Sequence, residues 1–299
     1  MPSIAELIAA AAAQLAAAGL AEPRRDAETL WLAASGQERA WRFAHPEAAP
    51  EAAAAARFQR WVTARAGHLP LQYLTGEQEF FGRAFRVTPA VLIPRPETEL
   101  VVAAAIEKAG ETARDRAGES LTLLDAGAGS GAIAVTLALE LQAGEDARPT
   151  DPKQEPGHWR VFACDRSAVA LAVARDNAAR VGGAVGLVQS DWLTAFAERP
   201  IFDLIVANPP YVAADEWVGL ERQVREYEPY AALVAGPTGR EAYQRLMPQA
   251  RARLRPGGWL ILETGYRSAA ALQSLLVGWA AVETRRDYQG WDRVLLLRR

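Results

Sequence analysis

Hydrophobic positions in the second part of the chain, from about residue 119, recur with two different spacings. Apolar runs of about four to six residues, typical of buried strands, alternate with longer stretches of helical periodicity. The predicted strands are Leu121–Leu124, Arg160–Cys164, Gly186–Gln189, Phe202–Ala207, Trp259–Glu263, Ala281–Arg286 and Arg293–Leu297. The predicted helices are 132–142, 167–181, 239–254 and 268–279. This alternation indicates an α/β fold with a doubly wound, mostly parallel, Rossmann-like sheet of seven strands.

Two connections refine this prediction. The last two strands are separated only by Asp287–Gly290, which is short enough for a hairpin, so the final strand should be antiparallel to its neighbour. The stretch 143–157 is rich in proline, glycine and charge and is predicted to be a long surface loop.

The first part of the chain has a helical pattern instead. Ser3 and Glu6 have the spacing of a capping box before an alanine-rich helix. A second helix contains Trp31, and a third runs over about Pro50–Arg65. We therefore predict a helical domain at residues 1–70. Aromatic residues around Gly82 then predict a β-hairpin linker at 71–93, followed by the α/β domain at 94–299.

Composition narrows the class of protein. The 299 residues carry a net charge of −3, which disfavours a protein that holds nucleic acid mainly through its phosphates, so no direct nucleic-acid partner is expected. The single cysteine, Cys164, cannot form a disulfide framework, and the histidines at 45, 68 and 158 have no metal-ligand spacing. We expect no metal site.

The beginning of the chain does not predict export. Its first 20 residues contain no basic residue, include Glu6 and are rich in alanine rather than leucine. No apolar run is long enough to span a bilayer. We therefore expect a cytoplasmic location and no membrane partner.

A glycine-rich loop follows the first strand of the α/β domain. Asp125 precedes Gly127, Ala128, Gly129, Ser130 and Gly131. Glycines at this position let the backbone approach a ligand closely, and the N-terminus of the next helix offers N–H groups. The spacing of Gly127, Gly129 and Ala132 also satisfies a dinucleotide fingerprint. The loop alone is therefore compatible with either a pyrophosphate or an adenosyl sulfonium.

The next two strands end in residues suited to the rest of such a ligand. Asp165 ends the second strand, where a carboxylate accepts hydrogen bonds from ribose hydroxyls. Asp191 and Trp192 follow the third strand, where they could bind the amino group and the face of an adenine. An N-cap role for Asp191 and a core position for Trp192 are the alternatives.

Asn208-Pro209-Pro210-Tyr211 follows the fourth strand. We interpret it as the site that binds the methyl acceptor, the group to be methylated. Two prolines end the strand at the edge where open α/β sheets bind ligands. A planar amide or amine nitrogen is a poor nucleophile, so its two N–H groups must be held by acceptors that aim its face at a methyl carbon. The Asn208 carboxamide oxygen and the Pro209 carbonyl could provide these acceptors. Tyr211 could pack on the planar group and near a cationic sulfonium.

These motifs together resemble a known family. Asn208–Tyr211 beside the glycine loop is similar to class I S-adenosylmethionine-dependent methyltransferases. Further motifs occur in one order: Pro70–Gly76, Phe80–Gly82, Val91–Glu99, Asp125–Gly131, Ser190–Trp192, Asn208–Tyr211, Tyr227–Pro229 and Ala232–Leu233. In this order they resemble the bacterial peptide chain release factor N5-glutamine methyltransferases, known as the PrmC or HemK family. Glu97, where that family more often has aspartate, and the long loop 143–157 are departures.

The resemblance implies an enzyme, its substrate and its site. It implies methyl transfer from S-adenosylmethionine to the side-chain amide nitrogen of the glutamine in the Gly-Gly-Gln motif of release factors, with residues 1–70 helping to dock that partner and 94–299 forming the methyltransferase domain. It further implies cofactor contacts at Gly127–Gly131, Asp165, Trp192 and Asn208. Asn208–Tyr211 would hold the glutamine.

Other functions remain open at this point. A close relative methylates a glutamine of a large-subunit ribosomal protein, and DNA or RNA amino-methyltransferases share Asn-Pro-Pro-Tyr. The net charge and the absence of an evident basic recognition segment count against nucleic acid. An NAD-dependent dehydrogenase would leave Asn208–Tyr211 unexplained. A binding module without catalysis is disfavoured because both motifs are intact.

Overall fold

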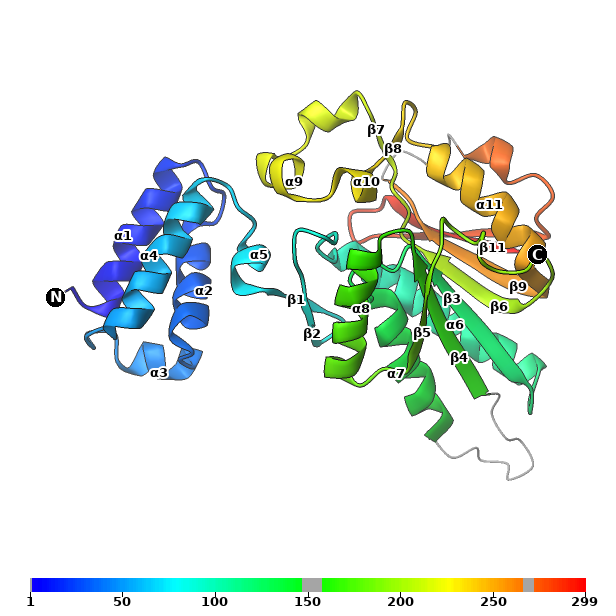
Figure 1. Ribbon diagram of the computed structural model, residues 1–299, viewed down its shortest axis with the longest axis horizontal. Coiled ribbons are helices and arrows are strands. Elements are labelled where there is room, and N and C mark those ends of the chain that lie inside the picture. Colours follow the sequence, from blue (N-terminus) through cyan, green and yellow to red (C-terminus); the bar gives the residue numbers. More distant parts are fainter. Residues whose placement is uncertain (1, 147–157, 266–271) are drawn as a thin grey trace. The chain divides into compact units, whose positions relative to one another are not determined.

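The computed structural model describes residues 2–146, 158–265 and 272–299. The chain forms two compact units (Figure 1). Unit 1 comprises Met1–Glu77 and Leu220–Tyr227, and unit 2 comprises Gln78–Gly219 and Glu228–Arg299.

Unit 1 is a small helical bundle. Its helices are α1 (Ile4–Ala17), α2 (Pro23–Ser35), α3 (Arg39–Ala44), α4 (Ala52–Ala66), α5 (Leu71–Thr75) and α9 (Arg222–Tyr227). The predicted capping box is present, because the Glu6 N–H donates to the Ser3 hydroxyl and the Ser3 N–H donates to the Glu6 carboxylate. Trp31 and Phe58 are fully buried and pack edge to face, with ring centroids 5.5 Å apart. The helical pattern of the sequence therefore reflects one apolar face of each main helix.

A buried ion pair ties the helices of unit 1 together. Arg65 Nε donates to Asp26 Oδ2 at 2.7 Å, and both side chains are buried. The Arg65 guanidinium also donates to the Gln223 side chain at 2.9 Å. The Tyr227 hydroxyl donates to the Gly67 carbonyl oxygen at 2.9 Å. These two bonds explain why Leu220–Tyr227, distant in the sequence, belongs to this unit.

Unit 2 is built on the predicted seven-stranded sheet. Its strands are β3 (Ser120–Ala126), β4 (His158–Asp165), β5 (Val185–Gln189), β6 (Phe202–Ala207), β9 (Leu254–Glu263), β10 (Ala281–Arg286) and β11 (Asp292–Arg298). Their order is β10-β11-β9-β6-β3-β4-β5. Neighbouring strands are parallel except at β11, which is antiparallel to both β9 and β10. The antiparallel final strand predicted from Asp287–Gly290 is confirmed.

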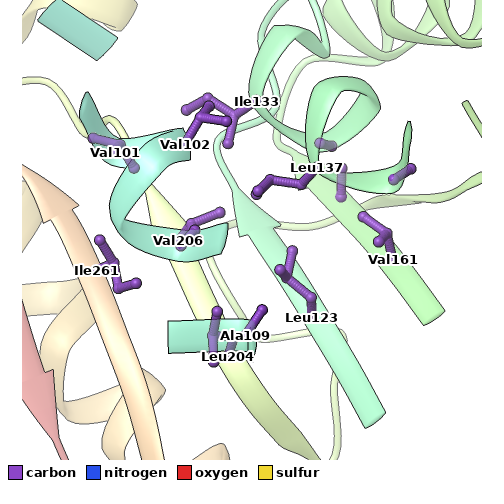
Figure 2. Close-up of a cluster of buried hydrophobic side chains, with 14 of the residues drawn as sticks. Val101, Val102, Ala109, Leu123, Ile133, Leu137, Val161, Leu204, Val206 and Ile261 are labelled. Carbon is purple, nitrogen blue, oxygen red and sulfur yellow. The ribbon is translucent and has the colours of Figure 1, made fainter. Parts of the chain in front are cut away.

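Alternate residues of the central strands point to opposite faces of the sheet and pack in two separate hydrophobic cores. Leu123, Leu204 and Val206 pack with helices α6 (Glu99–Asp115) and α7 (Ala132–Asp146), as Figure 2 shows. Leu124 and Ile205 face the opposite side, where α11 (Glu241–Arg253) covers the sheet. Because both faces are covered, β6 is buried at every position, and all its residues except Asp203 are apolar.

The hairpin of strands β1 (Glu77–Phe80) and β2 (Arg83–Arg86) packs on α8 (Ala168–Val181). Its turn residues Phe81 and Gly82 both have positive φ, the conformation that suits a two-residue hairpin loop. Buried Asn177 on α8 accepts from the Arg86 N–H at 2.7 Å and donates to the Arg86 carbonyl at 2.9 Å. The hairpin is thereby fixed to the sheet domain.

Several elements differ from the sequence-based expectations. The sequence patterns did not predict α3 and α5, which are too short for a periodic signal. The helix predicted at 268–279 lies partly outside the described residues, and from 272 onward there is only the 3₁₀ turn Gln273–Leu275, so that part was wrong. Helix α7 continues to Asp146, and residues 147–157 of the predicted surface loop lie outside the described residues.

Unit 2 also contains short elements outside the seven-stranded sheet. They are the 3₁₀ turns Pro96–Thr98 and Glu216–Gly219, helix α10 (Tyr230–Leu233), and strands β7 (Val212–Ala213) and β8 (Val234–Gly236), which pair in parallel. Among the described helices, none has both the length and the apolar character that crossing a membrane requires.

Candidate active site

A cavity of about 400 Å³ lies at the carboxyl ends of β3, β4 and β6. Its walls include Gly127–Ser130, Asp165, Asp191, Trp192, Asn208 and Pro210. From β3 the chain proceeds outward to β4 and β5 and then returns to the other side of β3 as β6, so the cavity lies at the switch point of the sheet. Its volume is within the range of small-molecule sites. The residues predicted from four separate stretches of sequence are thus brought together.

Three predicted site residues do not line the cavity. Pro209 is buried, and Tyr211 is partly buried and packs against the core cluster that includes Tyr243 and Leu246 of α11. Gly131 contacts α8 instead, where a Cβ would lie 3.0 Å from the Ala174 Cβ. Close helix packing therefore accounts for this glycine without a ligand.

The glycine loop has a conformation that ordinary side chains rarely adopt. Gly127 and Gly129 have φ values of +95° and +52°. The N–H groups of Gly127 and Ala128 both donate to the Cys164 carbonyl oxygen, at 2.8 and 2.9 Å, which holds the loop against β4. Asp125, fully buried below, accepts from the Ala134 N–H at 3.2 Å, and burial raises the pKa of its carboxyl to about 7.

Asp165 is part of the loop structure as well as of the cavity wall. Its Oδ2 accepts from the Gly129 N–H at 3.0 Å, and its Oδ1 accepts from the Ser167 N–H at 2.8 Å. A carboxylate has about four acceptor positions, so two remain for a ligand. A pair of ribose hydroxyls matches this remaining capacity.

Trp192 and Asp191 form a further part of the cavity wall. Trp192 has a φ of +52°, and a Cβ on Gly127 would lie 3.9 Å from its ring, so this glycine keeps the space beside the indole open. Asp191 forms an ion pair with Arg245 of α11, and both side chains are about half exposed. Asp191 does not cap a helix, because a turn follows it in the chain.

The Asn208 side chain is held by residues distant in the sequence. Asn208 Nδ2 donates to Thr98 Oγ1 at 3.1 Å, and Thr98 Oγ1 donates to Glu263 Oε2 at 2.5 Å. Thr98 also lines the cavity, and Glu263 ends β9 and is fully buried. The Tyr211 hydroxyl approaches the other Glu263 oxygen, at 3.5 Å.

Motif residues without a role in the sequence analysis stabilise the cavity wall. Buried Glu228 accepts from the Ile93 N–H at 3.1 Å and from the Arg95 guanidinium at 2.5 Å. These bonds connect two of the quoted motifs, Val91–Glu99 and Tyr227–Pro229. Asn177 donates to the Ser130 carbonyl oxygen at 2.8 Å and so supports the glycine loop. A buried asparagine within an apolar helix was the available signal for Asn177.

The cavity fits the cofactor that its motifs imply. S-adenosylmethionine combines an adenine, a ribose, a cationic sulfonium and an amino acid. Asp165 has acceptors left for the ribose, the indole of Trp192 is beside the loop, and Gly127 and Gly129 present no side chains to obstruct the remaining part. The antiparallel β11 between β9 and β10 also separates this sheet from the six-stranded dinucleotide-binding order. Fold and site define a class I S-adenosylmethionine-dependent methyltransferase.

Comparisons with known proteins specify the family. Residues 6–76 match the family model described as the PrmC N-terminal domain, and residues 112–221 match the methyltransferase small domain. The release factor glutamine methyltransferase of Moorella thermoacetica is 42% identical over 290 residues, covering 95% of this chain and 94% of that protein. That of Cereibacter sphaeroides is 41% identical over 299 residues, covering 98% of each chain. The chain belongs to the release factor glutamine methyltransferase family.

A solved structure independently supports the fold. The hMettl16 catalytic domain, determined in complex with an RNA hairpin of the MAT2A 3′UTR, has a TM-score of 0.53 and 18% identity, covering 82% of this chain and 81% of that chain. At this identity the similarity shows the fold alone. The predicted fold class and the methyltransferase assignment are both confirmed.

Proposed function

We propose that this enzyme methylates the side-chain amide nitrogen of the Gly-Gly-Gln glutamine in peptide chain release factors. One structural observation carries the proposal: Asn208 and Pro210 line the same cavity as Asp165 and the glycine loop. A methyl donor held by that loop and an amide presented at Asn208 would therefore meet. The names of the relatives, release factor glutamine methyltransferase, support this protein substrate.

The residues of the chain would act by binding and orientation. S-adenosylmethionine supplies an electrophilic methyl group when bound. Asp165, Trp192 and Gly127–Ser130 would hold it, with Asp191 at the adenine end. The Asn208 carboxamide oxygen, in the cavity wall, would accept one of the two amide N–H groups and aim the nitrogen face at the methyl carbon. The Pro209 residue is buried outside that wall, so its carbonyl oxygen would accept the second N–H only from a glutamine inserted past Asn208. The nitrogen then loses one proton, so no strong base is required.

A methyl-transfer assay with labelled S-adenosylmethionine tests this function. The assay tests four substrates in parallel: intact release factor, the same factor with its Gly-Gly-Gln glutamine replaced, the large-subunit ribosomal protein, and DNA. We expect label only on the intact factor. Label on DNA or on the ribosomal protein instead would refute the substrate assignment while leaving the methyltransferase class unchanged.

Asn208→Ala tests the acceptor site separately. The variant removes the carboxamide but leaves Asp165 and the glycine loop. Turnover should therefore be abolished, whereas the affinity for S-adenosylmethionine should decrease by a smaller factor than turnover does. Calorimetric titration with the cofactor and the methyl-transfer assay measure the two effects on one preparation. Wild-type turnover in this variant would rule out Asn208 as the acceptor-binding residue.

We also propose that residues 1–70 dock the release factor, with 71–93 as linker and 94–299 as the catalytic domain. On α3, Trp41 and Phe43 are 39% and 63% exposed, and aromatic residues are favoured contacts in protein interfaces. A Trp41→Ala, Phe43→Ala variant should raise KM for intact release factor without changing turnover of a short Gly-Gly-Gln peptide. An unchanged KM would exclude these two side chains as the docking contact. Because release factors act in translation, we place the enzyme in the cytoplasm.

A further inference from the structure

Asn208 is the end of a hydrogen-bonded chain that continues into the core. The chain runs from Asn208 Nδ2 to Thr98 Oγ1 at 3.1 Å and from Thr98 Oγ1 to Glu263 Oε2 at 2.5 Å. Thr98 is 4% exposed and Glu263 is 1% exposed, so both partners are almost completely removed from solvent. A 3₁₀ turn, the loop after β6 and the end of β9 thus converge on one side-chain amide.

The chemistry of the three groups fixes the direction of this chain. An ionised carboxylate accepts hydrogen bonds and has no proton to donate. While Glu263 is ionised, the single hydroxyl proton of Thr98 is therefore directed to Glu263, and only the hydroxyl lone pairs remain for Asn208. The NH₂ group of Asn208 must then face Thr98, which turns the carboxamide oxygen away from Thr98.

We propose that Thr98 and Glu263 are positioning residues for methyl transfer, which keep the Asn208 carboxamide oxygen oriented to accept an N–H of the substrate amide. This inference rests on the proposed function, because it assigns the reason why Asn208 presents its oxygen rather than its NH₂. A reversed carboxamide would place two donors against the two donors of the glutamine amide. The hydrogen bonds from Glu263 through Thr98 to Asn208 therefore determine whether the acceptor site is complementary to its substrate.

Protonation of Glu263 would reverse the chain. A neutral carboxyl donates to Thr98, whose hydroxyl proton is then free to bond the Asn208 oxygen. Burial raises the pKa of Glu263 to about 7, against the lowering effect of the Thr98 hydrogen bond. The titratable and charged groups that face it on neighbouring elements are Glu97, which raises the pKa, Arg293 and Arg95, which lower it, and the hydroxyls of Tyr211 and Tyr243. Activity should therefore decline as the pH falls through about 7.

Glu263→Gln tests the proposal with little change of shape. The glutamine amide donates to Thr98 as a protonated glutamate would, so kcat at pH 8.5 should fall about 10- to 100-fold, the scale of effect for a misoriented reactant. The residual activity should lack the decline near pH 7, and S-adenosylmethionine affinity should stay at the wild-type value. Glu140→Gln, on α7 and paired with Arg83, is the matched control and should keep the wild-type pH profile.

Substitutions of Thr98 separate positioning from general damage. Thr98→Val keeps the shape but removes the hydroxyl, and it should lower kcat as Glu263→Gln does. Thr98→Ser restores the hydroxyl and should recover most of the lost activity. Wild-type kcat and pH profile in both Glu263→Gln and Thr98→Val would overturn the proposal.

A second readout needs neither activity nor substrate. In ¹⁵N-labelled protein, the side-chain NH₂ signals of Asn208, assigned by their absence in Asn208→Asp, should shift with pH in the wild type and not in Glu263→Gln. Asn208 NH₂ chemical shifts that do not change with pH in the wild type would overturn the proposal, even if Glu263→Gln is inactive. If the wild type fails to methylate release factor, the proposed function fails. The NMR titration still decides whether the hydrogen bonds from Asn208 through Thr98 to Glu263 exist.

Discussion

Replacing Asp165 with asparagine should weaken S-adenosylmethionine binding about 10- to 150-fold. The carboxylate already accepts from the N–H groups of Gly129 and Ser167, one on each oxygen. Asparagine is nearly isosteric but has one oxygen, and its NH₂ opposes whichever backbone donor it meets. The cofactor thereby loses at least one hydrogen bond to a charged acceptor, about 1.5–3 kcal/mol, and each 1.4 kcal/mol is about tenfold in affinity.

Isothermal titration of the purified protein with S-adenosylmethionine measures this loss. The matched control is Asp176→Asn on α8, whose carboxylate forms a half-exposed pair with Arg86 at 3.1 Å and does not line the cavity. The control should bind as the wild type does. Thermal unfolding of both variants shows whether they are folded. A folded Asp165→Asn variant within twofold of wild-type affinity would refute the assignment of the ribose to this carboxylate.

Three further predictions concern stability. Gly131→Ala adds a Cβ 3.0 Å from that of Ala174 at a φ of +80°, so it should lower the free energy of unfolding by roughly 2–4 kcal/mol. Thermal unfolding measures this change, and an unchanged midpoint temperature would contradict the packing role. Asp26→Ala leaves the buried Arg65 without its carboxylate and should lower the unfolding free energy in urea by about 3 kcal/mol, whereas a loss below about 1 kcal/mol would show that this pair contributes little. Because the pKa of Glu263 is raised from 4.5 to about 7, the folded protein retains a proton that the unfolded chain releases. Stability relative to Glu263→Gln should therefore be greatest below pH 4.5 and fall by about 3 kcal/mol as the pH rises past 7, and parallel pH curves for the two proteins would argue against a raised pKa.

Much of the sheet was predictable because its signals are local. The strand Phe202–Ala207 has the predicted bounds, since a mostly apolar run followed closely by two prolines is compatible with few other structures. The glycine loop and Asp165 were placed at strand ends by their neighbours in sequence. Parallel strands then bring those ends to one edge, which is why residues 127, 165 and 208 could be assigned to one site before any distance was known.

Other features depended on contacts that no local pattern encodes. The hydrogen bond between Thr98 and Glu263 joins residues 165 positions apart, and Thr98 alone is compatible with a simple helix start. Gly131 resembles a ligand-binding glycine in the motif, but its contact is Ala174. The 3₁₀ turn at 273–275 lies within a stretch that the hydrophobic pattern predicted to be helical, so the local pattern did not determine the structure there.

The sequence by itself determined the family, the class of fold and the chemical types at the site, because strand endings, glycines and the Asn-Pro-Pro-Tyr turn are properties of adjacent residues. Only the tertiary structure decided which buried groups orient Asn208 and which carboxyl groups, those of Asp125 and Glu263, have a pKa raised to about 7. Both depend on burial and on partners from other segments, and the pKa of a carboxyl responds to the charges and solvent around it rather than to its neighbours along the chain.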